Sequence, residues 1–154
     1  MFAGVEKKAD GTGGQAEQAL GRSRGGFSTK IHAGVSGLGL PVRVVLTAGQ
    51  EADVTRAGRL IEGVPFEVVI ADKGYDKKAL VEEIESRGGE AVIPTLSTRK
   101  ERREIDAERY KDRNLAERFW HKVKRYRRVA TRYEKTARNF LAFAHVAPIM
   151  ILLR

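Results

Sequence analysis

Residues 110–124 read YKDRNLAERFWHKVK, and this stretch decides the fold and the chemistry expected of the chain. Within it, Tyr110, Arg113, Glu117 and Lys124 follow the spacing Y-x2-R-x3-E-x6-K. Each residue of an α-helix turns about 100° around the axis, so Tyr110 and Lys124 lie within about 20° of Glu117, and Arg113 lies about 40° away. The spacing therefore predicts four polar side chains on one narrow face of a helix.

Two interpretations of this face are open. The charged face of an amphipathic helix is commonly just solvated. A carboxylate projected among fixed cations also suits a site that handles phosphate groups and a metal ion. The opposite face is apolar and is expected to be buried, with Leu115, Phe119 and Tyr126 on it and Ala116 and Val123 on its flank.

Positive charge is concentrated around this helix. The chain of 154 residues carries a net charge of +9. Residues 99–138 contain 16 Lys or Arg and 7 Asp or Glu, whereas the remainder contains 13 of each. A basic block of this kind is expected of a nucleic-acid-binding protein, although a solubilising surface or contact with an anionic membrane or ribosomal RNA would also produce it.

The composition excludes several classes of protein. There is no cysteine, so disulfides and thiolate metal sites are impossible. His32, His121 and His145 do not have the spacing of a zinc site. The first residues lack the apolar core of a signal peptide, and the longest apolar stretch, residues 140–153, is too short to cross a bilayer. We therefore expect a cytoplasmic protein without membrane partners.

The hydrophobic pattern predicts the β-structure. Residues 27–35 and 42–47 are expected to form strands joined by the turn GLGLP, which makes a hairpin. The β-branched run at residues 66–71 predicts a buried strand. Residues 1–24, rich in Gly, Ala, Gln and Lys, predict a flexible linker or loop before a single partial domain at 25–154.

The remaining elements complete an α/β order. Asp53 is expected near the start of the first helix, and Asp76 is expected to cap the second. The order β-β-α-β-α-β-α-α indicates a mixed sheet flanked by helices. Helices are predicted at residues 52–62, 77–87, 107 or 111 to 128, and 136–153, with a short strand at 90–94 and a basic loop at 95–103.

Asp72 is a second candidate for chemistry. It comes directly after the predicted strand at residues 66–71 and before Lys73 and Gly74. Ligand sites of α/β sheets gather at the carboxyl ends of strands, so this carboxylate is placed to reach a metal ion in a cleft. Asp before Gly is also ordinary turn chemistry, and a turn or cap role is the simpler alternative.

Several separated motifs resemble one family. The Y-x2-R-x3-E-x6-K spacing resembles the signature of bacterial insertion-sequence transposases of the DDE class. ALGRSRGGFSTKIHAGVSGLGLPVRVVLTAGQEADV (19–54), VVIADKGYD (68–76) and TRYEKTARNFLAFAHVAPIMILL (131–153) are similar, in the same order, to further segments of that family. The resemblance covers roughly residues 19–154, and it implies an RNase H-like catalytic core.

The resemblance assigns chemistry to particular residues. It implies that Asp72 and Glu117 are the second and third acidic ligands of a metal site. Two Mg²⁺ (or Mn²⁺) ions about 4 Å apart can activate the attacking oxygen and stabilise the leaving oxygen of a phosphodiester, and they prefer carboxylate ligands. The resemblance further implies contacts with DNA, for each of which simple solvation is the alternative. The residues expected to make them are Tyr110, Arg113, Lys124, Lys73, Lys122, Arg125, Arg127, Arg128, Arg22 and Arg24.

The first acidic residue of the family is missing from the expected place. It belongs on a central strand before the hairpin, where this chain offers only Glu6, Asp10 and Glu17, and none of these lies in a β-branched run. The chain is therefore expected to lack the first strand of the sheet. We expect the isolated chain to be inactive and marginally stable, with a two-metal site only in the complete enzyme.

Three functional hypotheses follow. The chain is the C-terminal part of a transposase, joined by frameshifting to an upstream reading frame that carries the first Asp or left as a remnant. Alternatively, it is a DNA-binding module or accessory product of the element without catalysis. An unrelated nuclease with the same fold is the third. DNA ends and target are the expected partners, together with further copies of the chain in an active oligomer.

Overall fold

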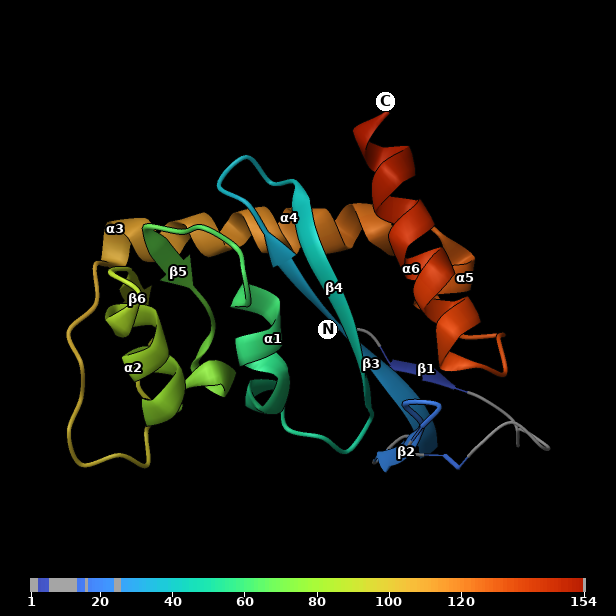
Figure 1. The fold of residues 1–154 in the computed structure, drawn as a ribbon, viewed down its shortest axis with the longest axis horizontal. Coiled ribbons are helices and arrows are strands. Elements are labelled where there is room, and N and C mark those ends of the chain that lie inside the picture. The colour runs from blue at the N-terminus through green and yellow to red at the C-terminus, as the bar shows by residue number, and fades with distance from the viewer. Residues whose placement is uncertain (1–2, 6–13, 16, 24–25, 154) are drawn as a thin grey trace.

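A long β-hairpin forms the centre of the structure (Figure 1). The computed structural model describes residues 3–5, 14–15, 17–23 and 26–153. Strands β3 (Gly26–Val35) and β4 (Pro41–Ala48) pair antiparallel, with Thr29 opposite Ala48 at one end. The turn between them holds Gly39 at a φ of 75°, a conformation that glycine adopts without steric cost. The predicted hairpin is confirmed.

Two short strands extend this sheet at one end of β3. β1 (Ala3–Val5) and β2 (Gly21–Ser23) both pair antiparallel with β3, and both reach Ser28, so they lie on its two opposite edges. β1 pairs only as far as Lys30 on the edge away from β4. Beyond it, residues 31–35 have no strand partner on that edge within the described part of the chain.

A second, parallel sheet lies apart from the first. It consists of β5 (Val68–Ile70) and β6 (Glu90–Val92), joined by the one-turn helix η2 (Lys73–Tyr75) and by α2 (Lys78–Ser86). No pairing joins the two sheets among the residues that the structure describes. The predicted mixture of a hairpin and a parallel crossover is therefore present, but in two small sheets.

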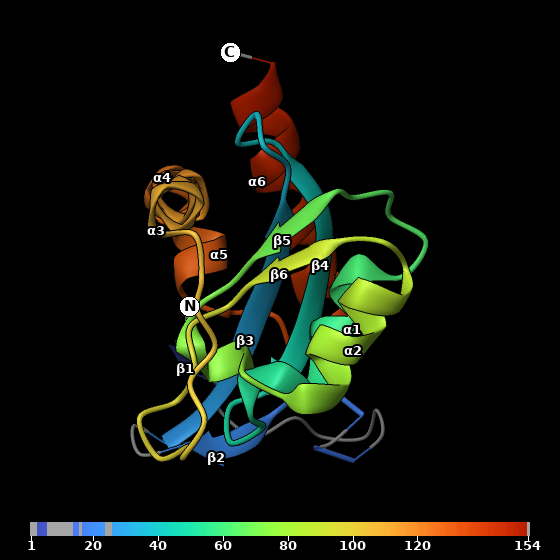
Figure 2. The same cartoon turned by 90° about the vertical axis from the view of Figure 1, so that its left-hand side faces the viewer.

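Helices cover the strands on two sides. Figure 2 shows α3 and α4 nearly end-on at one side of the strands, with α1 and α2 at the other. The remaining helices, α5 and α6, follow α4 and pack beside the hairpin (Figure 1). The bounds of these elements are η1 (Asp53–Arg56), α1 (Ala57–Ile61), α3 (Ala107–Tyr110), η3 (Lys111–Arg113), α4 (Asn114–Val123), α5 (Arg127–Ala130) and α6 (Ala137–Leu152).

Each sheet has its own hydrophobic core. Phe119, Val123 and Phe140 bring α4 and α6 onto the hairpin. Ile84 and Ile93 belong to a second cluster, which joins α1 and α2 to the β5–β6 sheet. Burying side chains of this size is worth about 1.5–3 kcal/mol each, so each cluster holds its own sheet and helices together. Among the described residues, no helix is long and apolar enough to cross a membrane.

Three local expectations need correction. The single helix predicted as far as residue 128 is interrupted by η3 and ends at Val123, because the chain tightens before α4 and turns again before α5. Asp76 does not cap α2, whose N-cap is Lys77, because the Asp76 carboxylate turns to Leu96, Arg99 and Arg103 instead. Two short strands also lie within residues 1–24, where a linker or loop was predicted; residues 1–2, 6–13, 16 and 24 are outside the described part.

Candidate active site

A groove separates the two sheets. It has a volume of about 920 Å³ and is lined from one side by residues 31–35 of β3 and from the other by residues 68–70 of β5 and by Ala71. Leu115, Ala116 and Trp120 of α4 contribute a third wall, and most of the lining is apolar. The groove therefore combines apolar side chains with strand edges that no other strand pairs within the described residues.

Asp72 lies in the lining of this groove, two residues after the end of β5. Its Oδ1 accepts a hydrogen bond of 2.8 Å from the backbone N–H of Gly74 and thereby caps η2. The predicted place at the carboxyl end of a strand is confirmed, and so is the simpler turn role. Both roles are possible at once, because the hydrogen bond from Gly74 uses Oδ1 of Asp72 and does not involve Oδ2.

Asp53 and Lys30 lie beside Asp72. A Cβ atom at Gly74 would lie 2.9 Å from Oδ1 of Asp72 and 3.8 Å from Oδ2 of Asp53, so the two carboxylates border one small space. Lys30 Nζ lies 3.1 Å from Oδ1 of Asp53 and donates to the carbonyl of Glu51. The positive charge of Lys30 compensates the negative charge of Asp53.

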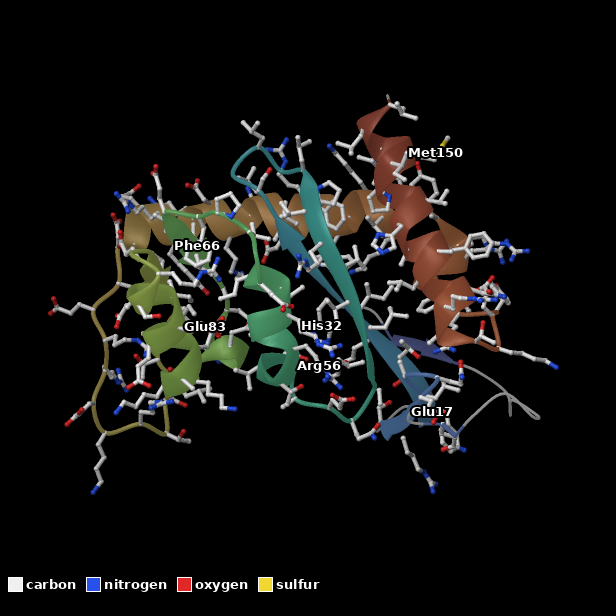
Figure 3. The ribbon with its side chains drawn as sticks, in the orientation of Figure 1. Glu17, His32, Arg56, Phe66, Glu83 and Met150 are labelled. Carbon is white, nitrogen blue, oxygen red and sulfur yellow. The ribbon has the colours of Figure 1, made fainter. Side chains whose placement is uncertain are left out.

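His32 and Tyr75 form a partly buried polar contact in the same groove. His32, labelled in Figure 3, is 2 % exposed, with Nε2 at 2.8 Å from Oγ1 of Thr47 and Nδ1 at 3.3 Å from the Tyr75 hydroxyl. Burial lowers the pKa of His32. Burial also raises the pKa of Tyr75 strongly, and the negative charges of Asp53 and Asp72 add to this. A protonated Tyr75 can thus donate to a neutral His32.

The signature residues Tyr110, Arg113 and Glu117 are brought together. Arg113 Nη2 lies 2.6 Å from Oε1 of Glu117, and its guanidinium carbon lies 5.7 Å from the ring centroid of Tyr110. Lys124 follows the last residue of α4 as its C-cap. Arg113 lines the groove, whereas the half-exposed Glu117 is not among its lining residues. The described residues contain no group of three carboxylates or histidines that could hold a metal ion.

Most of the predicted DNA-contacting residues lie on the surface. Lys73, Lys122, Lys124, Arg125 and Arg127 are exposed, and so is Arg22 on β2. Arg24 lies outside the described residues.

Two residues near the signature have structural contacts. Arg128 pairs at 2.9 Å with the largely buried Glu134, and its guanidinium carbon lies 4.9 Å above the Phe143 ring. Trp120 is partly buried against the first core, with its ring 5.2 Å from that of Phe119. Arg128 and Trp120 therefore contribute to packing within the fold.

Sequence reasoning did not single out His32, Lys30, Asp53 and Tyr75 as neighbours of Asp72. Tyr75 stands three residues after Asp72 in the run ADKGYD, and this proximity in the sequence could have indicated that the two are neighbours. The others come from β3 and η1; the folded arrangement brings His32 and Asp53 to the groove, and Lys30 reaches Asp53.

Comparison with known proteins agrees with this description. Residues 7–152 match the family described as a transposase DDE domain. Over 130 residues the chain is 42 % identical to a protein of Brucella ovis named putative transposase for insertion sequence element IS6501, an alignment that covers 83 % of this chain and 100 % of that protein. No solved structure matches the chain. The chain belongs to the family of DDE transposase domains.

Proposed function

We propose that this chain is the C-terminal part of an insertion-sequence transposase with an RNase H-like core, and that it cleaves and transfers DNA strands only after a further strand completes that core. Membership of the transposase family gives it a role in DNA transposition. Asp72 and Glu117 are proposed as two of three carboxylates for Mg²⁺ or Mn²⁺. The third is proposed to come from outside residues 1–154, on the product of an upstream reading frame.

The groove between β3 and β5 is the observation that carries this proposal. Strand edges present backbone N–H and C=O groups that favour pairing with another strand. Here two such edges flank one apolar groove of about 920 Å³. An inserted strand would pair with both edges and join the two sheets into one, and its apolar side chains would fill the groove. Asp72 borders the groove where such a strand could bring a carboxylate.

The donor set within the described residues does not fit a pair of metal ions. Asp53 and Asp72 border one space, but Glu117 is held by Arg113 and does not line the groove. A metal pair that promotes phosphodiester exchange needs more carboxylate ligands than these two, correctly oriented. The isolated chain is therefore proposed to be inactive, and α4 is proposed to reorient Glu117 in the complete enzyme.

Reconstitution tests this function. The chain would be co-expressed with the polypeptide encoded upstream and incubated with Mg²⁺ and DNA that carries the ends of the element. We expect cleavage only with both components, and loss of cleavage in Asp72→Asn and in Glu117→Gln. Glu108→Gln is the matched control, because Glu108 is an exposed carboxylate of α3 that pairs with Lys111 of η3. Unchanged cleavage in either active-site variant would contradict the assignment.

A non-catalytic DNA-binding product of the element is the second candidate. The Arg113–Glu117 ion pair favours it, because a carboxylate neutralised in this way can serve as a structural partner. The exposed cations near α4 would then bind DNA without chemistry. Salt-sensitive DNA binding that persists while the reconstituted complex fails to cleave DNA would support this candidate over the first.

A further inference from the structure

A second, smaller recess lies beside Lys73 and shares no lining residue with the groove. It has a volume of about 270 Å³, and its polar lining consists of Lys73, Thr95, Ser97, Arg102 and Arg103. Sites for drug-sized ligands usually have about 300–1,000 Å³, so this recess suits one small group. Three cations and two hydroxyls around such a volume match the chemistry of a phosphate group.

The shape of the recess is fixed by a buried carboxylate. Asp76 accepts from the backbone N–H of Leu96 at 2.8 Å and contacts Arg99 Nε at 2.8 Å and Arg103 Nη2 at 2.5 Å. Arg103 also donates its backbone N–H to Thr95 Oγ1 at 2.9 Å. These contacts tie the loop at residues 95–103 to the end of η2. The recess is therefore built into the fold and does not depend on long surface side chains alone.

The cations of the recess are only partly compensated. Asp76 compensates Arg103, but no described carboxylate lies within ion-pair distance of Lys73 or Arg102. The Nε–H of Arg103 is buried and has no hydrogen-bond acceptor in the described structure. A buried donor without an acceptor is costly, so the contacts that Arg103 makes with Asp76 and Thr95 must hold it in this position.

We propose that this recess binds one backbone phosphate of DNA through Lys73, Arg102 and Arg103, next to Asp72. The inference rests on the proposed role in DNA transposition and adds a defined anchor to it. Lys73 directly follows Asp72 in the sequence, so a phosphate held here places the neighbouring stretch of the DNA strand close to the proposed ligand. Phosphate contacts of this kind fix the register of DNA without reading its sequence.

DNA affinity measured on this chain alone tests the site. The variant Lys73→Gln/Arg102→Gln would be compared with Lys77→Gln/Lys100→Gln, which removes the same charge from the same two segments at exposed residues outside the recess. Binding of a short fluorescent duplex would be followed by anisotropy across a range of salt. We expect the recess variant to lose about tenfold or more in affinity, with a salt slope lower by about 0.9, because the recess neutralises one phosphate and each neutralised phosphate contributes about 0.9. Equal losses of affinity in the two variants would overturn the proposal.

Two further measurements keep the result decisive. The charge-conserving variant Lys73→Arg/Arg102→Lys should retain DNA binding. On the unaltered chain, the bound duplex should protect Lys73 and Arg102 from chemical modification more than it protects Lys77 and Lys100. Inorganic phosphate is the competing ligand: if it saturates the recess at micromolar concentration and the duplex does not displace it, the site serves a free anion and the proposal fails. Cleavage is measured separately in the reconstituted complex, so loss of the phosphate anchor and failure of the catalytic assignment are distinguishable.

Discussion

The hydroxyl oxygen of Tyr75 lies 3.3 Å from Nδ1 of His32, across the groove that separates the two sheets. The residues are 43 positions apart, one on β3 and the other on η2 after β5. His32 also contacts Thr47 on β4 at 2.8 Å. A series of side-chain contacts from β4 through β3 to η2 thus joins two sheets that share no backbone pairing within the described residues.

Removing the Tyr75 hydroxyl should weaken this junction. Tyr75→Phe leaves Nδ1 of the buried His32 without its partner, and an unsatisfied buried polar group costs about 1–3 kcal/mol. We expect the free energy of unfolding in urea to fall by that amount. Tyr133→Phe is the control, because Tyr133 is 57 % exposed. An equal effect in both variants would show that the cross-sheet contact contributes nothing.

Stability should depend on pH through His32. Burial lowers the folded-state pKa of His32 below its ordinary value of 6.5, so the unfolded chain binds the proton more readily. The stabilising contribution is then complete above about pH 6.5 and is lost as the pH falls toward the folded-state value. Urea unfolding at a series of pH values should show this decline, and His32→Gln should flatten it. The exposed His145 supplies the control, because His145→Gln should leave the decline intact.

The Asp76 carboxylate should stabilise the loop at residues 95–103. Although burial alone would raise its pKa, the Leu96 N–H and the guanidinium groups of Arg103 and Arg99 hold it below its ordinary value of 3.8. Its contribution is therefore present above that pH and is lost as the pH falls toward the folded-state value. We expect Asp76→Asn to cost about 2–3 kcal/mol at neutral pH, measured by urea unfolding. Asp112→Asn, at an exposed residue, should cost much less.

Exposed cations near α4 should supply most of the non-specific DNA affinity. Lys122, Arg125 and Arg127 are exposed, and replacing all three with Gln should lower the salt slope of binding by about 0.9 for each DNA phosphate that they neutralise. Anisotropy titrations of duplex DNA at several salt concentrations measure the slope. The control replaces Arg59, Lys77 and Lys78, on or beside α1 and α2, which Figure 2 shows on the other side of the strands. If both triple variants change the salt slope equally, DNA affinity depends on the net charge of the chain and not on the surface near α4.

Local patterns predicted the regular elements well. The alternation and turn chemistry of residues 27–47 depend on neighbours a few positions apart, and the hairpin formed as expected. The β-branched run before Asp72 likewise formed β5. Asp72 was placed correctly because the position of a residue after a strand is itself a local property. The same holds for α2, whose bounds lie within one residue of the predicted range.

Long-range contacts account for most of the differences. Asp76 was expected to cap α2, because nothing local reveals that Arg99 and Arg103 will reach it. The 3-10 turn η3 interrupts the regular α-helical spacing from which the shared polar face of the signature residues was predicted. The His32–Tyr75 contact links two elements far apart in the sequence. In each case the outcome depends on how two segments pack together, which periodicity does not encode.

Hydrogen exchange should report directly on the groove. Backbone amides that point from residues 31–35 and 68–70 into it have no strand partner among the described residues, so they should exchange quickly in the isolated chain. If the upstream polypeptide inserts a strand, the same amides should become protected, because they then pair on both edges. Amides of β4 opposite Thr29–Gly34 are already paired and serve as the internal control. Recovery of DNA cleavage without any change in exchange along the groove would show that the missing carboxylate reaches Asp72 by another route.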